Sequence, residues 1–397
     1  MQDKTIQTDV LIIGASASGL MCAIEAGKRG RKVSILDHAG KPGKKILIAG
    51  GGRCNFTNYD VSAENYISHN PHFCKSALSR FSQWDFIAMI NDYKIPYHER
   101  EHGQLFCDNS AKDILNMLLL ECEKAGVKIR LNCEIKQIEN PDDSTFSIDT
   151  SLGIFQATSL VIATGGLSIP RMGASPFGYK VAEQFEHHIW PTRAGLVPFT
   201  LQPHDKAMLA ELSGVAIDSI VSNKRIQFRE NILFTHRGLS GPAILQISSY
   251  WQAGETISIN LLPELDLVDL LTTRKTAQPK TKLKTVLAEF LPKRLLLTLP
   301  GQETLDKPLQ DISHSRIGKI AQQLQHWQIN PNGTEGYRTA EVTLGGIDCN
   351  ELSSKTMESR KVTGLYFVGE VVDVTGWLGG YNLQWAWSSG WCSGQVV

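Results

Sequence analysis

An apolar run followed by a glycine turn near the N-terminus constrains this chain more than any other feature. Residues 10–13 are apolar throughout, which is typical of a strand buried on both faces of a parallel sheet. The turn 14–19 (Gly-Ala-Ser-Ala-Ser-Gly) follows, and residues 21–28 continue as a helix whose first amides can bind phosphate oxygens. A second strand, 32–36, ends on Asp37, at about the 20-residue spacing of an acid that bonds a ribose hydroxyl. The stretch predicts a Rossmann dinucleotide-binding unit.

Ser16 departs from the G-x-G-x-x-G pattern, because it occupies the second glycine position. That position is where the backbone comes closest to the pyrophosphate. A serine fits there if its hydroxyl turns toward a phosphate. The alternative is an ordinary strand-to-helix turn without a ligand, but the agreement of strand, helix and Asp37 favours the nucleotide site.

Length and charge limit the classes of protein to which this chain can belong. At 397 residues the chain exceeds one ordinary core, so two domains, or one domain with a large insertion, are expected. Forty basic and forty acidic residues balance, so no overall field attracts nucleic acid or acidic membranes. The N-terminus has no signal-peptide pattern and no apolar run approaches the length of about 18 residues that spans a membrane. These features predict a cytoplasmic protein.

The eight cysteines are scattered and form no C-x-x-C pair. We therefore expect neither a metal site nor a disulfide framework.

Two further glycine-rich segments extend the expected nucleotide site. Gly50, Gly51 and Gly52 precede Arg53, so a loop with exposed amides lies beside a cation and can wrap a dinucleotide; the alternative is a flexible surface turn. Cys54 follows, and we do not expect it to be catalytic. Residues 160–166 read as another buried strand that runs into glycines, and they would meet the ligand at the carboxyl edge of the sheet.

The residue pattern of the chain changes between about residues 190 and 338, which predicts an inserted domain. His236 lies there on a glycine-flanked loop, where an imidazole can move protons near neutral pH; the alternative, that it only caps backbone, stays open. The insert also carries a basic stretch, which we interpret as a solvated face rather than a nucleic-acid site: Lys280, Lys282, Lys284, Lys293 and Arg294.

The closing segment favours a flavin over a nicotinamide. Residues 364–370 form a strand that ends in Gly369-Glu370, and residues 379–386 open a final helix. A dinucleotide as long as FAD stretches across its fold, so a second contact site far away in the sequence is expected. Reduced isoalloxazine gathers negative charge that backbone amides and a helix N-terminus would stabilise.

With these segments identified, the chain resembles a bacterial flavoprotein family that includes dehydro-bile-acid reductase-like and aminoacetone-oxidase-like members. The resemblance covers nearly the whole chain and rests on these motifs: residues 50–55 (GGGRCN), 163–166 (ATGG), 234–236 (FTH) to 240–242 (SGP), 342–346 (VTLGG), 356–359 (TMES) and 379–384 (GGYNLQ). It implies FAD and a glutathione-reductase-like fold interrupted by a β-barrel-like piece and a small helical piece. Ser16 and Asp37 depart from the family, since glycine and glutamate are commoner at these positions.

The fold class expected is therefore α/β, with domains placed as follows: 1–190, FAD-binding domain, first part; 191–262, inserted β-rich domain; 263–328, inserted helical domain; 329–339, return strand of the insert; 340–397, FAD-binding domain, second part. The residues expected to contact FAD are Gly14, Ala15, Ser16, Ala17, Ser18, Gly19, Asp37, His38, Lys44, Gly51, Gly52, Arg53, Cys54, Asn55, Thr57, Ile135, Ala163, Thr164, Gly165, Gly166, Gly369, Glu370, Gly379, Gly380, Tyr381, Asn382 and Leu383.

We expect an FAD-dependent oxidoreductase that transfers hydride through flavin N5 and reduces a small organic substrate with electrons from NAD(P)H. No second G-x-G-x-x-G follows a strand, so a transient NAD(P)H would visit the flavin itself. The substrate would enter between the FAD domain and the insert, with His236 as the acid or base. The alternatives are an amine or aminoketone oxidase and a non-catalytic FAD protein with an RNA or protein partner. We expect no membrane and no nucleic-acid partner, and the oligomeric state stays open.

Overall fold

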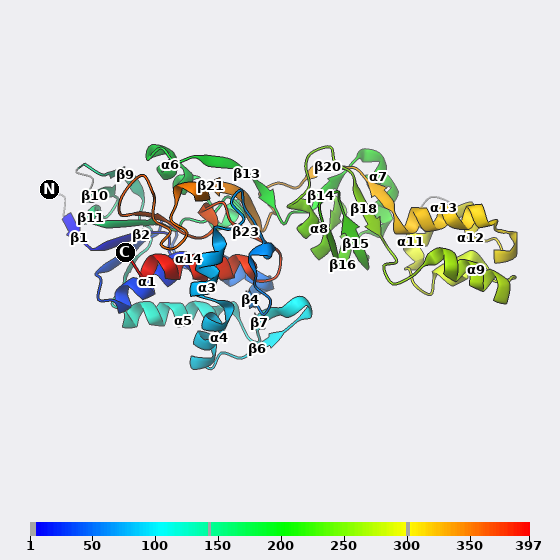
Figure 1. Ribbon diagram of the computed structural model, residues 1–397, viewed down its shortest axis with the longest axis horizontal. Coiled ribbons are helices and arrows are strands. Elements are labelled where there is room, and N and C mark those ends of the chain that lie inside the picture. The colour runs from blue at the N-terminus through cyan, green and yellow to red at the C-terminus, as the bar shows by residue number, and fades with distance from the viewer. Residues whose placement is uncertain (1–4, 142–143, 299–301) are drawn as a thin grey trace. The chain divides into compact units, whose positions relative to one another are not determined.

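The computed structural model describes residues 5–141, 144–298 and 302–397 (Figure 1). The chain divides into two compact units. Unit 1 comprises residues 1–193 and 342–397, and unit 2 comprises residues 194–341. The first and last parts of the polypeptide therefore build one body, and each unit is described by itself below.

A five-stranded parallel sheet lies at the centre of unit 1. Its order is β22 (Leu365–Phe367), β12 (Ser159–Ile162), β2 (Val10–Ile13), β3 (Val33–Leu36) and β8 (Lys128–Arg130). Parallel strands buried on both faces are expected to be apolar, and all residues of β2, β3, β12 and β22 are buried. The prediction of an α/β Rossmann fold is confirmed.

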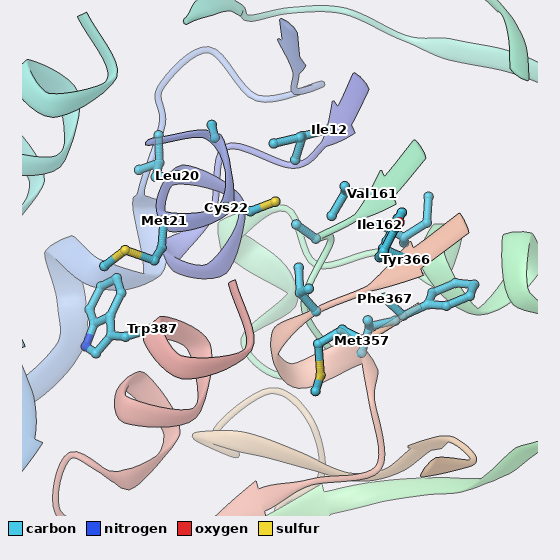
Figure 2. Packing of buried hydrophobic residues seen from close by; sticks show 14 of the residues in the cluster. Ile12, Leu20, Met21, Cys22, Val161, Ile162, Met357, Tyr366, Phe367 and Trp387 are labelled. Atoms are coloured by element: carbon cyan, nitrogen blue, oxygen red, sulfur yellow. The ribbon is translucent and has the colours of Figure 1, made fainter. Parts of the chain in front are cut away.

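Two helices from opposite ends of the chain pack against each other beside this sheet. Helix α1 (Ala17–Lys28) follows β2 directly, and α14 (Tyr381–Gly394) closes the chain (Figure 1). Their close approach requires small residues, because a Cβ at Gly390 would lie 2.3 Å from the carbonyl oxygen of Ser18. Figure 2 shows the core between them, with Met21 of α1 near Trp387 of α14 and Phe367 of β22 beyond.

The other helices of unit 1 cover its remaining core. The longest of them is α5 (Ala111–Lys124), with Ile114, Leu115, Leu118 and Cys122 buried on one face. The shorter helices are α2 (Lys44–Ile48), α3 (Cys74–Arg80), α4 (Gln83–Asp92) and α6 (Phe177–Gln184).

Smaller sheets complete unit 1. One has the order β1 (Thr5–Gln7), β11 (Gly153–Ala157), β10 (Phe146–Thr150) and β9 (Ile135–Glu139); another has the order β4 (Asn55–Asn58), β7 (Gln104–Cys107) and β6 (Tyr97–Glu99). Two ribbons pair β5 (Tyr66–Ile67) with β23 (Thr375–Gly376) and β13 (Ile189–Gly195) with β21 (Val342–Ile347).

The glycine loop predicted at residues 50–52 lies between two ordered elements. Ile46–Ile48 belongs to α2, Ala49–Gly52 forms a 3₁₀ turn, and Asn55–Asn58 is strand β4. The reason is burial, since Ile46 and Phe56 are buried in the core and anchor the chain on both sides of the glycines.

Unit 2 contains a seven-stranded sheet and a group of helices. The sheet order is β19 (Trp327–Ile329), β18 (Ile257–Asn260), β15 (Ala216–Ser222), β16 (Gln227–Phe234), β17 (Gly238–Ser240), β14 (Phe199–Leu201) and β20 (Pro331–Thr334). Its helices are α7 (Pro203–Leu209), α8 (Pro242–Ser248), α9 (Leu267–Ala277), α10 (Leu283–Leu287), α11 (Lys293–Thr298), α12 (Gln302–Leu305) and α13 (His314–Gln325).

Among the residues that the structure describes, no helix combines the length and the apolar character needed to cross a membrane.

Candidate functional site

The glycine turn after β2 is held against the end of β12. Gly14 has φ +112°, and a Cβ there would lie 2.4 Å from the carbonyl oxygen of Ala163. A Cβ at Gly19 would lie 2.1 Å from the carbonyl oxygen of Gly14. Both glycines are therefore required by close backbone packing at the carboxyl edge of the sheet.

Ser16 is the N-cap of α1. Its Oγ accepts a hydrogen bond from the Gly19 amide at 3.2 Å and lies 3.2 Å from the Ser18 hydroxyl. Serine is a favoured N-cap because its side chain satisfies an amide that the helix leaves unpaired. The departure from glycine at this position thus stabilises the start of the helix.

A cavity of about 410 Å³ opens beside this turn, at the carboxyl ends of β2, β3 and β12. Ligands of open α/β sheets bind at this edge. The predicted residues that line the cavity are Gly14, Ala15, Ser16, Ala17, Asp37, His38, Lys44, Ile135, Ala163, Thr164 and Gly165.

Sequence reasoning missed a second group of lining residues, which includes three lysines: Lys41, Gly43, Lys45, Cys133, Glu134, Met172, Gly173, Ala174, Ser175, Pro176, Phe177 and Lys180. With Lys44, four lysines line the cavity against the carboxylates of Asp37 and Glu134. This excess of cations suits a diphosphate. The lysines at 41, 44 and 45 were visible in the sequence, but no motif connected 172–180 with the glycine turn.

Asp37 joins the end of β3 to the glycine turn. Its Oδ2 accepts a hydrogen bond from the Ala15 amide at 2.8 Å, and its Oδ1 accepts one from the Ala39 amide at 2.8 Å. A carboxylate has about four lone-pair positions, so both oxygens retain capacity for a ribose hydroxyl.

Glu370 binds Lys45 at the other side of the cavity wall. Lys45 Nζ donates to Glu370 Oε2 at 2.7 Å and to the Ser168 hydroxyl at 2.8 Å. Glu370 also accepts hydrogen bonds from the amides of Thr343 at 2.8 Å and Gly166 at 3.3 Å. Burial opposes its ionisation, but Lys45 and these amides outweigh burial and lower the pKa of Glu370 below its usual value.

Gly369 is the point where the first and last parts of the chain meet. A Cβ there would lie 2.5 Å from the Ser18 hydroxyl oxygen, at the start of α1. The Gly369 amide donates to Ser389 Oγ at 3.0 Å, and its carbonyl accepts from Trp385 Nε1 at 3.0 Å, both on α14. Neither Gly369 nor Glu370 lines the cavity. Lys45 lines it and binds Glu370.

The N-terminus of α14 offers a second binding surface in unit 1. Gly380 has φ +94°, no side chain caps this 14-residue helix, and a Cβ at Gly380 would lie 2.3 Å from the carbonyl oxygen of Thr57. Asn382 holds the turn closed, since its amide exchanges two 2.8 Å hydrogen bonds with the backbone of Gly376. Such a helix end favours negative charge, which fits the reduced ring of a flavin.

The side chains of Cys54 and Thr57 point into the protein. Both residues are fully buried, and Thr57 Oγ1 donates to Gln384 Oε1 of α14 at 2.6 Å. Burial and the neighbouring Cys107 raise the pKa of the Cys54 thiol well above its usual value, so the thiol stays protonated. Any contact of these two residues with a cofactor would be made by their backbone.

The predicted acid or base, His236, lies in unit 2 on the turn between β16 and β17. It is exposed, and the turn is closed by a hydrogen bond from the Thr235 amide to the Gly238 carbonyl at 2.8 Å. The predicted cofactor residues all lie in unit 1.

A second histidine was missed by sequence reasoning. His69 Nδ1 lies 2.9 Å from Asp373 Oδ2, and its ring stacks on Trp190 with centroids 3.8 Å apart. Asp373 is buried, and this burial, opposed by His69, raises the pKa of its carboxyl. The arrangement fixes one ring nitrogen and leaves the other available, as in histidines that transfer protons. The partners are 304 positions apart, so no local pattern connects them.

Comparison with known proteins assigns a family. The model of the HI0933-like protein Rossmann domain matches residues 8–396. Two curated proteins named ribosomal RNA dihydrouridine synthase are close relatives. The Escherichia coli (strain K12) protein is 56% identical over 98% of this chain and 97% of its own length. The Haemophilus influenzae protein (strain ATCC 51907 / DSM 11121 / KW20 / Rd) is 50% identical over 96% of both chains.

A more distant relative agrees with the expected resemblance. The 3-dehydro-bile acid delta(4,6)-reductase of Clostridium scindens is 27% identical and covers 97% of this chain and 98% of its own length. Among solved structures, the quinol fumarate reductase subunit FrdA of E. coli matches with a TM-score of 0.51 at 17% identity, over 99% of this chain and 70% of that one. This likeness shows the fold alone.

The names of the two close relatives correct one expectation. We expected a small-molecule substrate and no nucleic-acid partner, whereas both relatives are named for action on ribosomal RNA. A balanced total charge was therefore the wrong criterion, because it averages over the surface on which RNA would bind.

The Glu370 carboxylate predicts a pH-dependent contribution to stability. Because its pKa is lower in the folded than in the unfolded chain, ionised Glu370 stabilises the fold above the unfolded pKa of about 4.3, and this contribution is lost as pH falls through the folded pKa. The melting temperature of Glu370→Gln should therefore fall below that of the natural protein at pH 7, and the difference should shrink toward pH 3. The measurement is thermal unfolding across this range.

The variant Lys45→Met, alone and combined with Glu370→Gln, is the control. If the cost of Glu370→Gln at pH 7 is the same with and without Lys45, the ion pair is not the source of the effect.

Proposed function

Since the chain belongs to the HI0933-like Rossmann family and is a flavin-dependent oxidoreductase, we propose that it reduces uridine in ribosomal RNA to dihydrouridine, with FAD as its cofactor and NAD(P)H as electron donor. The observation that carries this proposal is the 56% identity to the E. coli enzyme over 98% of this chain. The match covers both units of the chain and not only the nucleotide-binding part.

The residues of unit 1 fit FAD. The glycine turn, the start of α1 and the cavity lysines would hold the diphosphate, and Asp37 would bond the adenosine ribose. The uncapped start of α14 would receive the flavin ring. We infer that unit 1 is the glutathione-reductase-like FAD domain and that unit 2 is its insert.

The chemistry requires two electrons and two protons. Reduction of the C5–C6 double bond of uracil adds a hydride to one carbon and a proton to the other, and it leaves the ring carbonyls unchanged. When bound, FAD supplies the hydride after it has been reduced by NAD(P)H. The protein must exclude water from the ring, hold the base and supply the proton.

Replacement of Gly14 should abolish flavin retention. In Gly14→Ala the new methyl group would lie 2.4 Å from the carbonyl oxygen of Ala163, so the turn must move away from the sheet edge. We expect the flavin absorbance per purified chain to fall at least about tenfold, the equivalent of about 1.4 kcal/mol of binding energy.

Gly30→Ala is the matched control. Gly30 also has a positive φ, +81°, but nothing lies within 4 Å of its added Cβ, so only backbone strain of about 1–2 kcal/mol is expected. Full flavin content in folded Gly14→Ala would contradict the assignment of the turn to FAD.

The substrate is tested with RNA from cells that lack this protein. The flavin-loaded protein, incubated without oxygen with that ribosomal RNA and NADPH or NADH, should form dihydrouridine, which mass spectrometry of the nucleosides detects as a gain of two hydrogens. Reactions without NAD(P)H or with free uridine are the controls. If the flavin is reduced and reoxidised by small enones while the RNA stays unchanged, the proposal is wrong.

His236 is proposed as the proton donor, and its replacement should slow RNA reduction without releasing FAD. For His236→Ala we expect a loss of roughly 10²- to 10⁴-fold in turnover, the usual contribution of an acid or base. His204→Ala, at another exposed histidine of unit 2, is the control. An unchanged rate in His236→Ala would remove His236 from the reaction and leave His69 as the candidate in unit 1.

A further inference from the structure

The balanced total charge of the chain conceals one strongly basic segment. Residues 274–294 contain seven of the forty basic residues and only one of the forty acidic residues. The remainder of the chain therefore has thirty-three basic against thirty-nine acidic residues. A segment of 21 residues carries the positive charge that cancels the negative charge of the rest.

In the part of the segment that contains α10 and α11, the apolar side chains are buried and the cations are exposed to solvent. Leu283, Val286 and Leu287 of α10 and Leu295 and Leu296 of α11 are buried. The cations of these two helices and of the turn before α10 are exposed: Lys280, Lys282, Lys284, Lys293 and Arg294. We refer to these five side chains as the basic face.

Only part of the basic face is neutralised within the protein. Lys282 lies 3.4 Å from the Asp306 carboxylate, which also binds Lys284. Glu289, the acid within the segment, is paired with Arg274 at 2.8 Å. Within residues 5–141, 144–298 and 302–397, no ion pair is recorded for Lys280, Lys293 or Arg294. These three exposed side chains can therefore contact an external anion.

An exposed aromatic ring lies between the cations in the sequence. Phe290 is 39% exposed, although large apolar side chains are usually buried. It lies between the end of α10 and Lys293, the first residue of α11. No ring of the described residues is recorded as stacking on it. Single-stranded nucleic acids bind where cations contact phosphates and exposed rings stack on bases, and this segment offers both kinds of side chain.

We propose that the basic face and Phe290 form the surface of unit 2 that binds the ribosomal RNA substrate. The inference rests on the proposed function and adds where the RNA is held. Lys280, Lys293 and Arg294 contact phosphates, and Phe290 stacks on an unpaired base. The earlier interpretation of these lysines as an ordinary solvated face is replaced, because their charge is concentrated and partly unpaired.

The test uses the flavin-loaded full chain and a fluorescent single-stranded fragment of ribosomal RNA. In the variant Lys280→Glu/Lys293→Glu/Arg294→Glu, the affinity at about 0.1 M salt should fall at least tenfold. The slope of log affinity against log salt should decrease by about 2, since each lost phosphate contact on a single strand removes about 0.7.

A matched charge reversal elsewhere is the control. Lys75, Lys112 and Lys206 are exposed lysines outside the basic segment. The variant Lys75→Glu/Lys112→Glu/Lys206→Glu changes the net charge equally, so it should keep the salt slope of the natural protein. Equal losses in the two triple variants would mean that only total charge matters, and this would overturn the proposal.

Phe290 is tested separately, because stacking does not depend on salt. Phe290→Ala should weaken RNA binding on the order of tenfold with an unchanged salt slope, and Phe290→Trp should restore the affinity. If Phe290→Ala binds RNA like the natural protein, the ring does not take part.

The outcomes separate this inference from the proposed function. Reduction of the flavin by NAD(P)H should be unchanged in every variant, because all three cations and Phe290 lie in unit 2. If the natural protein forms no dihydrouridine, the proposed function fails. If it does so and the basic-face variant binds and reduces RNA equally well, the assignment of this surface fails.

Discussion

The close packing of α1 against α14 is the constraint on which the structure depends. It brings residues from opposite ends of the chain within van der Waals contact, and it requires glycine at 390, where a Cβ would meet the Ser18 backbone at 2.3 Å. The same contact places Gly369 against the start of α1, so the strand β22 completes a sheet begun by β2. The N-termini of α1 and α14, which we propose bind the diphosphate and the flavin ring, therefore belong to one packed core.

Because the first and last parts of the chain meet in unit 1, an ion pair between these two parts can hold the cavity wall. Lys45 belongs to the N-terminal part and Glu370 to the C-terminal part. They bond at 2.7 Å, and two backbone amides and the Ser168 hydroxyl also donate to the Glu370 carboxylate. A buried carboxylate without these partners would take up a proton. The contact between the N-terminal and C-terminal parts of unit 1 is thus coupled to the ionisation of Glu370.

Local features could be predicted from the sequence, and contacts between distant segments could not. Residues 10–13 and 32–36 were predicted as buried strands from their apolar runs, and the Rossmann prediction rested on them, on the helix between them and on Asp37. No secondary structure was predicted for Asn55–Asn58, because only its pairing with β7 and the burial of Phe56 make it a strand. His69 and Asp373 meet only through the pairing of β5 with β23, which no short pattern encodes.

The error about nucleic acid has a related physical origin. A long-range field depends on net charge, which is zero here, but screening at physiological salt limits each charge to a range of about 8 Å. A polyanion that touches the surface therefore responds to the local density of cations, not to their total. A chain of zero net charge can therefore still offer an RNA-binding surface, as we propose for residues 274–294, where seven basic residues lie within 21 positions. Under the proposed function, RNA binding by unit 2 and redox chemistry in unit 1 would use different residues of the chain.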